Sequence, residues 1–208
     1  MSATGIELVC FDLGRVLIPI CDSWEQACRL TGVPMPDSLR DPGVLKRAGA
    51  LVEQHETGRI DADTFDREAA ALSGLTSGQV AMLSVAWIFR PYPGVTALID
   101  RVVATGVRTA CLSNTNDRHW EILNADLPLD RLDYRFASHL LGAVKPQPRP
   151  YELVESDTRI PPGAILYFDD HPPNVETGLS RGWQSVRIDP SGNTVEQMTS
   201  HLRGKAVF

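Results

Sequence analysis

The sequence predicts an α/β fold: a Rossmann-like, mostly parallel sheet flanked by helices, with an inserted helical cap. Short apolar runs of strand length recur along the chain. Helix-like segments of about 10–15 residues separate most of these runs, which is the βαβ pattern of a parallel sheet. The long gap after the first run breaks this pattern, because it contains no convincing strand. The five expected strands are residues 6–11, 107–112, 134–138, 164–168 and 185–188.

The long gap after the first strand is predicted to be helical. Ser23 with Gln26, and Thr76 with Gln79, have the spacing of a capping box, a reciprocal pair of hydrogen bonds at a helix start. Apolar side chains at intervals of three and four predict amphipathic helices at residues 45–57 and 63–72.

The chain is therefore expected to have two parts: a core of residues 1–19 and 91–208, and a helical cap of residues 20–90 inserted into it. The length of 208 residues fits one domain with a smaller insertion. A last amphipathic helix is predicted from Asn193 to His201, after which the tail is expected to fray.

Composition and charge limit the function classes. Hydrophobic residues make up 43% of the chain, as in folded globular proteins. The net charge of −6 gives no long-range attraction for nucleic acid or anionic membranes, so neither is expected as a partner. The sequence shows no secretory signal, no membrane span and no CxxC pair, and Cys10 and Cys111 are expected to be buried. We expect a cytoplasmic protein, a monomer or a homodimer, with a small-molecule substrate.

Polar residues follow the first four predicted strands at their carboxyl ends, where ligands bind in open parallel sheets. By itself each has a structural explanation, because such residues also form turns and cap helices, and lysines are usually solvated. Their common position at one edge of the sheet favours a functional site. In chain order they are Asp12, Ser113, Asn114, Lys145, Asp169, Asp170 and Asn174, and Gly14 in the first loop adds a backbone carbonyl.

These residue types favour phosphoryl transfer. Asp12 and Asp170, with a backbone carbonyl of the first loop, offer the hard oxygen ligands that Mg²⁺ requires. The metal would neutralise enough charge for the Asp12 carboxylate to attack a phosphate. Ser113 can hold a phosphoryl oxygen, and Lys145 can supply a fixed positive charge. An aspartyl-phosphate would then form and be hydrolysed.

Four segments resemble the ordered motifs of the haloacid dehalogenase-like (HAD) hydrolase superfamily, and the helical insertion resembles the cap of its cap-type-1 members. The segments are Phe11-Asp12-Leu13-Gly14-Arg15-Val16-Leu17, Leu112-Ser113-Asn114-Thr115, Val144-Lys145-Pro146, and Phe168-Asp169-Asp170 with Asn174. The resemblance implies an aspartyl nucleophile at Asp12 and Mg²⁺ held by Asp12, the Gly14 carbonyl and Asp170. It also implies that Asp169 and Asn174 support the metal site, and that Ser113, Asn114 and Lys145 hold the phosphate.

One position departs from the pattern of the superfamily's phosphatases, which usually carry a second aspartate two residues after the nucleophile as general acid and base. That position is Gly14 here, and glycine cannot transfer a proton. Such catalysis typically contributes about 10²–10⁴-fold. Three interpretations stay open. The substrate has a good leaving group, His171 or a cap residue replaces the acid, or the protein is a catalytically weak relative that binds phosphate.

Haloacid dehalogenation is the alternative chemistry, because those relatives also lack the second aspartate and form an aspartyl ester without a metal. Their tyrosine-glycine-threonine run is absent here. Phosphonate cleavage would need a cap lysine, for which Lys46 is the one candidate. We therefore predict a Mg²⁺-dependent phosphatase of a small phosphorylated metabolite, such as a sugar phosphate. The candidates for the arginine and aromatic pocket of a dehalogenase are Arg15, Arg29, Arg40, Arg90, Trp24 and Trp87.

Overall fold

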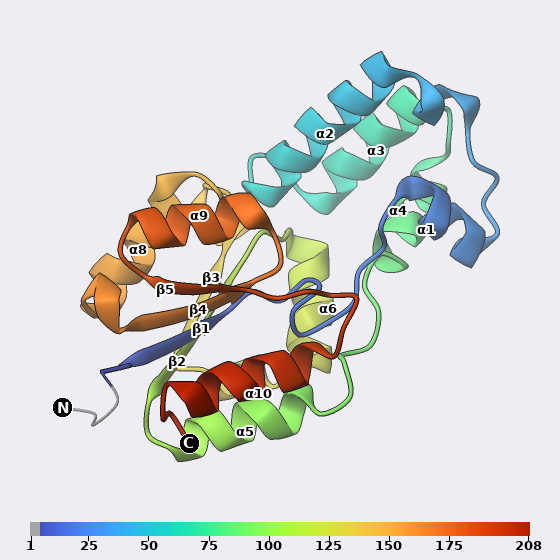
Figure 1. Ribbon diagram of the computed structural model, residues 1–208. Coiled ribbons are helices and arrows are strands. Elements are labelled where there is room, and N and C mark those ends of the chain that lie inside the picture. Colours follow the sequence, from blue (N-terminus) through green and yellow to red (C-terminus); the bar gives the residue numbers. More distant parts are fainter. Residues whose placement is uncertain (1–4) are drawn as a thin grey trace.

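Five parallel strands form one sheet in the order β3-β2-β1-β4-β5 in the computed structural model, which describes residues 5–208 (Figure 1). All neighbouring strands are parallel. The predicted Rossmann-like α/β fold is confirmed, and each strand lies close to its expected run. The strands are β1 (Leu8–Phe11), β2 (Arg108–Ser113), β3 (Tyr134–Ala137), β4 (Ile165–Asp169) and β5 (Gln184–Arg187).

Helices cover both faces of the sheet (Figure 1). One face carries α5 (Val95–Ala104) and α10 (Thr194–Gly204), and the other carries α8 (Pro148–Thr158) and α9 (Pro172–Ser180). The remaining core helices follow β2 and β3, respectively: α6 (Asp117–Asp126) and α7 (Ser138–Leu141).

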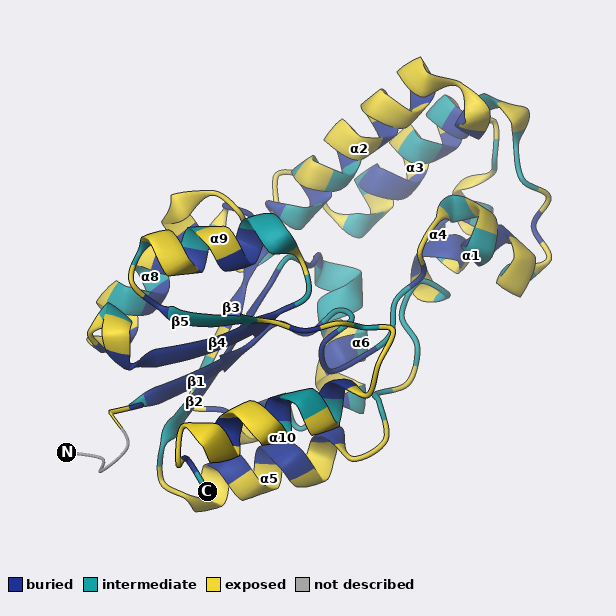
Figure 2. Ribbon diagram, in the orientation of Figure 1, coloured by how far each residue is buried: buried dark blue, intermediate teal, exposed yellow. Residues whose placement is uncertain are grey.

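The central strands are buried on both sides, which their unbroken apolar sequences require. Alternate side chains of β1 enter opposite cores, so that Val9 and Phe11 pack into one cluster and Leu8 and Cys10 into the other. Figure 2 shows this burial as dark blue strands between helices that are buried on one side and exposed on the other. The sheet is therefore a rigid support for the loops at its carboxyl edge.

Five α-helices lie between β1 and β2 in the chain. The last of them, α5, packs on the sheet, and the first four stand apart from it (Figure 1). Thr76 and Gln79 form the predicted capping box. Ser23 caps its helix as expected, but Gln26 accepts a hydrogen bond from the N–H of Asp22 instead of that of Ser23. The exact cap boundaries, residues 20 and 90, stay a prediction. The helices are α1 (Trp24–Thr31), α2 (Pro42–Glu56), α3 (Ala62–Ser73) and α4 (Ser77–Val85), with a short 3₁₀ turn at Asp37–Arg40.

The C-terminal tail differs from the prediction that it frays after His201. The last helix continues to Gly204, and Val207 is buried in the core. The guanidinium carbon of Arg101 lies 4.0 Å from the ring centroid of Phe208. The prediction was wrong because the tail is held by α5, an element about a hundred residues earlier in the chain, and local sequence carries no sign of that contact.

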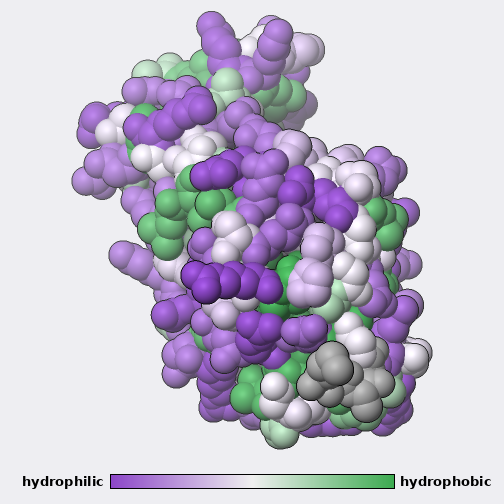
Figure 3. Space-filling view, turned by 90° about the vertical axis from the view of Figure 1, so that its left-hand side faces the viewer, coloured by the Kyte–Doolittle hydropathy of each residue, from purple (hydrophilic) through white to green (hydrophobic). Residues whose placement is uncertain are grey.

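The face in Figure 3 is mainly hydrophilic, with small hydrophobic patches among the polar side chains. Across residues 5–208, no helix combines the length and the apolar character needed to cross a membrane. Cys10 and Cys111 are buried and free, as expected, and so are Cys21 and Cys28.

Candidate active site

Three aspartates from two neighbouring strands meet at the carboxyl edge of the sheet. β1 pairs with β4 so that Phe11 lies opposite Phe168, which brings Asp12 next to the Asp169-Asp170 pair. One carboxylate oxygen of each residue lies within 4.8 Å of the other two. Asp12 and Asp169 are buried, and Asp170 is half-buried. The sequence placed these side chains at one edge, and the structure brings them together.

Lys145 is buried between two of these carboxylates. Its Nζ lies 3.0 Å from Asp12 Oδ1 and 2.7 Å from Asp169 Oδ2. It also donates to the carbonyl oxygen of Leu112 at 2.8 Å and to the hydroxyl of Tyr167 at 3.1 Å. Burial favours the neutral amine, but the carboxylates of Asp12 and Asp169 outweigh it and raise the pKa of Lys145. The side chain is therefore a fixed cation, not a solvated surface lysine.

Asp169 is held by a dense set of donors. Tyr167 donates its hydroxyl proton to Oδ2, and the N–H of His171 donates to Oδ1 at 2.8 Å. The Nδ2 of Asn174 lies 3.1 and 3.0 Å from the two carboxylate oxygens. Burial opposes ionisation, yet the charge and hydrogen bond of Lys145 lower the pKa of Asp169. Asp169 is thus an anchor that fixes Lys145.

The pKa of Asp12 is raised, whereas the pKa of Asp169 is lowered. Burial raises the pKa of Asp12 to about 7; Lys145 opposes this shift, and the charge of Asp169 adds to it. Burial and the charge of Asp169 also raise the pKa of Asp170. A divalent cation bound here would favour the ionised forms of Asp12 and Asp170, because its charge would offset the repulsion among the three carboxylates.

Hard oxygen donors of this kind fit Mg²⁺, which prefers carboxylates and carbonyls. The carboxylates of Asp12 and Asp170 can approach one ion, as the close spacing of their oxygens shows. Asn174 is buried and fixes Asp169, while its own Oδ1 has no partner among the described residues. The residues at this edge therefore suit a divalent cation.

Ser113 and Asn114 lie at the end of β2, next to the loop that carries Asp12. The Ser113 side chain is buried, and its hydroxyl makes one long contact of 3.5 Å with the Asn114 carbonyl. The side chain of Asn114 binds the backbone of Lys145, donating to its carbonyl at 2.9 Å and accepting from its N–H at 2.8 Å. Asn116, two residues later, caps α6. Ser113 is available to a ligand, whereas Asn114 positions Lys145.

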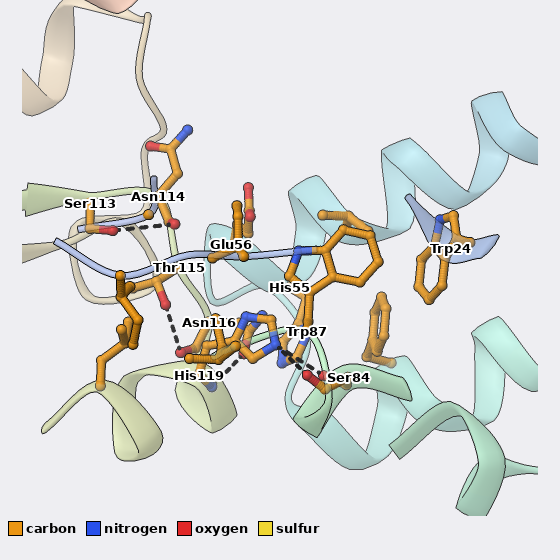
Figure 4. Close-up of a pocket in the computed structure, with 17 residues that line it drawn as sticks. Trp24, His55, Glu56, Ser84, Trp87, Ser113, Asn114, Thr115, Asn116 and His119 are labelled. Carbon is orange, nitrogen blue, oxygen red and sulfur yellow. Dashed lines mark hydrogen bonds between the residues drawn. The ribbon is translucent and has the colours of Figure 1, made fainter. Parts of the chain in front are cut away.

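A cavity of about 220 Å³ lies between the helices of residues 24–85 and the sheet edge. Gly14, Ser113 and Asn114 line it on the sheet side. Figure 4 shows Ser113 and Asn114 at one end and Trp24 at the other, with His55, Glu56 and Trp87 between them. The cavity therefore begins at Gly14 and Ser113, at the carboxyl edge of the sheet, and extends into the helical insertion.

Glu56 is the carboxylate of this cavity that the sequence did not reveal. It ends α2 and is half-buried, and its carboxyl group makes no hydrogen bond or ion pair with the rest of the described chain. Burial raises its pKa to about 7, with Lys145 opposing and Glu53 adding to the shift. Its sequence signal is an ordinary glutamate at a helix end, so only the tertiary arrangement identifies it.

Other residues singled out from the sequence have structural partners. His171 is exposed at the start of α9, and Arg90 pairs with Asp126 at 2.6 Å. Arg15 pairs with Asp22 at 2.9 Å. His119 lines the cavity, and its ring Nε2 lies 2.9 Å from the Ser84 carbonyl oxygen. Burial lowers the pKa of His119 to about 4, so this ring is neutral at pH 7.

The start of α6 ties the helical insertion to the core. His55 Nε2 lies 2.6 Å from Asp117 Oδ1. Arg118 makes a two-pronged ion pair with Asp66, at 2.9 and 2.7 Å. With the His119–Ser84 contact, these bonds fix α2, α3 and α4 above the sheet edge and so define the shape of the cavity.

A parallel sheet with three clustered aspartates at its carboxyl edge, beneath a helical insertion, defines an α/β enzyme whose site lies beyond the strand ends. The chain belongs to the haloacid dehalogenase-like hydrolases, because residues 6–180 match this family.

Related sequences include phosphatases. The chain is 25% identical to D-ribitol-5-phosphate phosphatase from Bacteroides thetaiotaomicron, over 93% of this chain and 97% of the relative. It is also 25% identical to a phosphatase from Mycobacterium tuberculosis, over 95% and 94%. Mouse acyl-CoA dehydrogenase family member 10 is 27% identical over 93% of this chain, which spans only 19% of that protein.

Solved structures share the fold. A HAD family enzyme from Bacteroides thetaiotaomicron has a TM-score of 0.79 at 19% identity, covering 93% of this chain and 98% of that one. A structure of a HAD family enzyme from the same organism, in complex with magnesium and inorganic phosphate, gives 0.71 at 20% identity over 90% and 96%. The L-2-haloacid dehalogenase of Xanthobacter autotrophicus gives 0.60 at 18% identity over 98% and 84%.

Proposed function

We propose that this protein is a Mg²⁺-dependent phosphomonoester hydrolase that acts on a small phosphorylated metabolite through an aspartyl-phosphate at Asp12. The observation that carries the proposal is the group formed by Asp12, Asp169, Asp170 and the buried Lys145. A dehalogenase has no need of such a cation site. The two phosphatase relatives, and the magnesium and phosphate complex of a protein with this fold, support the same choice.

The residues divide the work as follows. Asp12, the Gly14 carbonyl and Asp170 would hold Mg²⁺, which when bound offsets the negative charges that meet at the site. The Ser113 hydroxyl holds a phosphoryl oxygen. Lys145 keeps Asp12 in place through the 3.0 Å contact and contributes positive charge where the transferred phosphoryl group becomes most negative.

Glu56 is the carboxyl group that we propose to replace the acid missing at Gly14. It lines the same cavity as Gly14 and Ser113 and is free of protein partners in the described chain. A carboxylate oxygen of Asp12 attacks phosphorus, the bond to the ester oxygen breaks, and the Glu56 proton passes to that oxygen. Water then attacks phosphorus of the aspartyl-phosphate while Glu56 accepts its proton. The bond between phosphorus and the Asp12 oxygen breaks, which frees inorganic phosphate and restores the carboxylate.

Hydrolysis of p-nitrophenyl phosphate tests the proposal. Turnover is expected with Mg²⁺ and is lost in EDTA, and Asp12→Asn abolishes it. Asp37→Asn, an exposed aspartate on the helical insertion, is the matched control and retains activity. Equal turnover in EDTA would contradict the metal-dependent mechanism. Chloride release from 2-chloropropionate without phosphatase activity would establish the dehalogenase instead.

A further inference from the structure

The cavity beside the proposed catalytic residues has mainly apolar walls. Trp24, Phe65 and Trp87 line it from the helical insertion, and the ring centroids of the two tryptophans are 5.2 Å apart. Val52 and Ile20 also contribute to the walls. Aromatic and aliphatic walls of this kind stabilise a ligand through burial of apolar surface.

Most polar side chains of the cavity are already bonded to protein atoms. Asn116 accepts a hydrogen bond from the His119 backbone N–H at 2.9 Å, and its Nδ2 lies 3.2 Å from His119 Nδ1. The other ring nitrogen of His119 is engaged by Ser84. These groups have little remaining capacity to bind the hydroxyl groups of a ligand.

The same holds for two further polar residues. His55 is held by Asp117, and both ends of the Asn114 amide are held by the backbone of Lys145. Three side chains remain available among the polar lining residues: the Glu56 carboxyl and the hydroxyls of Ser113 and Thr115, whose contacts with protein are both 3.5 Å long. In the proposed mechanism, Ser113 binds the phosphate and Glu56 faces the ester oxygen.

We propose that this cavity holds the alcohol part of the substrate, and that this alcohol is apolar, close to one aromatic ring in size, with few or no other hydroxyl groups. The inference rests on the proposed phosphatase function and narrows its substrate class. The volume of about 220 Å³ agrees with this size. An apolar cavity of about 150 Å³ holds benzene, so the remainder accommodates a short link to the phosphate.

A sugar phosphate fits such a cavity poorly. Its hydroxyl groups are hydrogen-bonded in water, and the cavity offers too few available polar groups to replace most of those bonds on entry. An unpaired hydroxyl lowers binding by about tenfold or more. A polyol phosphate with four such groups is therefore disfavoured by about 100-fold or more, and the inference favours an apolar ester over the sugar phosphate that the sequence suggested.

The experiment compares kcat/KM for benzyl phosphate, ribitol 5-phosphate and acetyl phosphate, all with Mg²⁺. Benzyl and ribitol phosphates are both esters of primary alcohols, so their leaving groups are similar, while acetyl phosphate is too small to need the cavity. We expect benzyl phosphate to exceed ribitol 5-phosphate by about 100-fold or more. Equal or faster turnover of ribitol 5-phosphate overturns the inference but leaves the phosphatase function in place.

A matched pair of variants tests whether the alcohol part of the substrate lies in this cavity. Val52→Phe narrows the cavity and is expected to raise the KM for benzyl phosphate at least about tenfold more than the KM for acetyl phosphate. Val85→Phe makes the same change at an exposed site of α4 outside the cavity and should leave both substrates unaffected. An unchanged KM in Val52→Phe overturns the inference. Absence of turnover with all three phosphates overturns both this inference and the proposed function.

Discussion

Replacing Lys145 by methionine removes the positive charge that lies between Asp12 and Asp169. The wild-type ammonium has four acceptors within 3.1 Å and is almost completely buried, so no water can replace it. Methionine has a similar length but leaves two buried carboxylates without a counterion. Breaking a buried ion pair in this way costs about 3–5 kcal/mol of unfolding free energy.

That loss is measurable by urea unfolding, followed through tryptophan fluorescence. For a chain of this size, it corresponds to a decrease in Tm of about 6–20 °C. Lys46→Met is the matched control, because Lys46 is exposed on α2 and its replacement is expected to change stability by no more than about 0.5 kcal/mol. The measurement is made in EDTA so that metal binding does not contribute.

The pH dependence of the Lys145→Met variant supplies a second check. Without Lys145, the pKa values of Asp12 and Asp169 rise in the folded state, above those of the unfolded chain. The folded state then binds more protons than the unfolded state, so stability falls as pH rises through this window, by about 1.4 kcal/mol per pH unit and proton. The loss of unfolding free energy in Lys145→Met relative to wild type should therefore be larger at pH 8 than at pH 5.

A double variant separates charge from packing. Lys145→Met combined with Asp169→Asn removes one of the uncompensated charges and should recover part of the lost stability. If Lys145→Met unfolds at the same urea concentration as wild type at pH 8, the reasoning about a buried, fixed cation is refuted.

Three more predictions concern the carboxyl groups. In EDTA, wild-type protein should be less stable at pH 8 than at pH 5.5, because the pKa values of Asp12 and Glu56, about 7, exceed their unfolded values. Mg²⁺ should raise the Tm more at pH 8 than at pH 5.5, and equal Tm shifts at the two pH values would contradict this. Glu56→Gln should slow the hydrolysis of alkyl phosphates about 10²–10⁴-fold and that of p-nitrophenyl phosphate much less. Wild-type turnover of alkyl phosphates should fall above pH 7, where Glu56 loses its proton. Glu68→Gln, at an exposed glutamate of α3, is the control. Adding Gly14→Asp to the Glu56→Gln variant should restore alkyl phosphate turnover, because it supplies a new carboxyl group beside the nucleophile. The substitution fits, since a Cβ at this position would lie at an ordinary 3.5 Å from Ile20. No rescue in kinetic assays argues against Glu56 as the general acid.

The sheet and the acidic edge could be predicted from sequence because each depends on local signals. Strands such as β1 and β4 are buried on both faces, so their apolar runs are nearly unbroken. The parallel topology then forces Asp12 and Asp170 to the same edge. Residue type and order were sufficient for this part of the site.

The cavity could not be predicted, because it depends on how the helical insertion sits on the core. Glu56 and Ser113 are distant in sequence and come together through contacts such as Arg118–Asp66. The burial of Lys145 was also hidden, since lysines are rarely buried unless paired, and its partners lie on other strands.

The hydrogen bonds and the ion pair at the start of α6 bear on product release in the proposed mechanism. Asp117, Arg118 and His119 follow within six residues of Ser113 on a continuous stretch of backbone. In the proposed mechanism Ser113 binds the phosphate, so an outward movement of the insertion would pull on the segment that binds the product. Opening of the insertion and release of phosphate would then be coupled, and weakening the Arg118–Asp66 ion pair would speed that release.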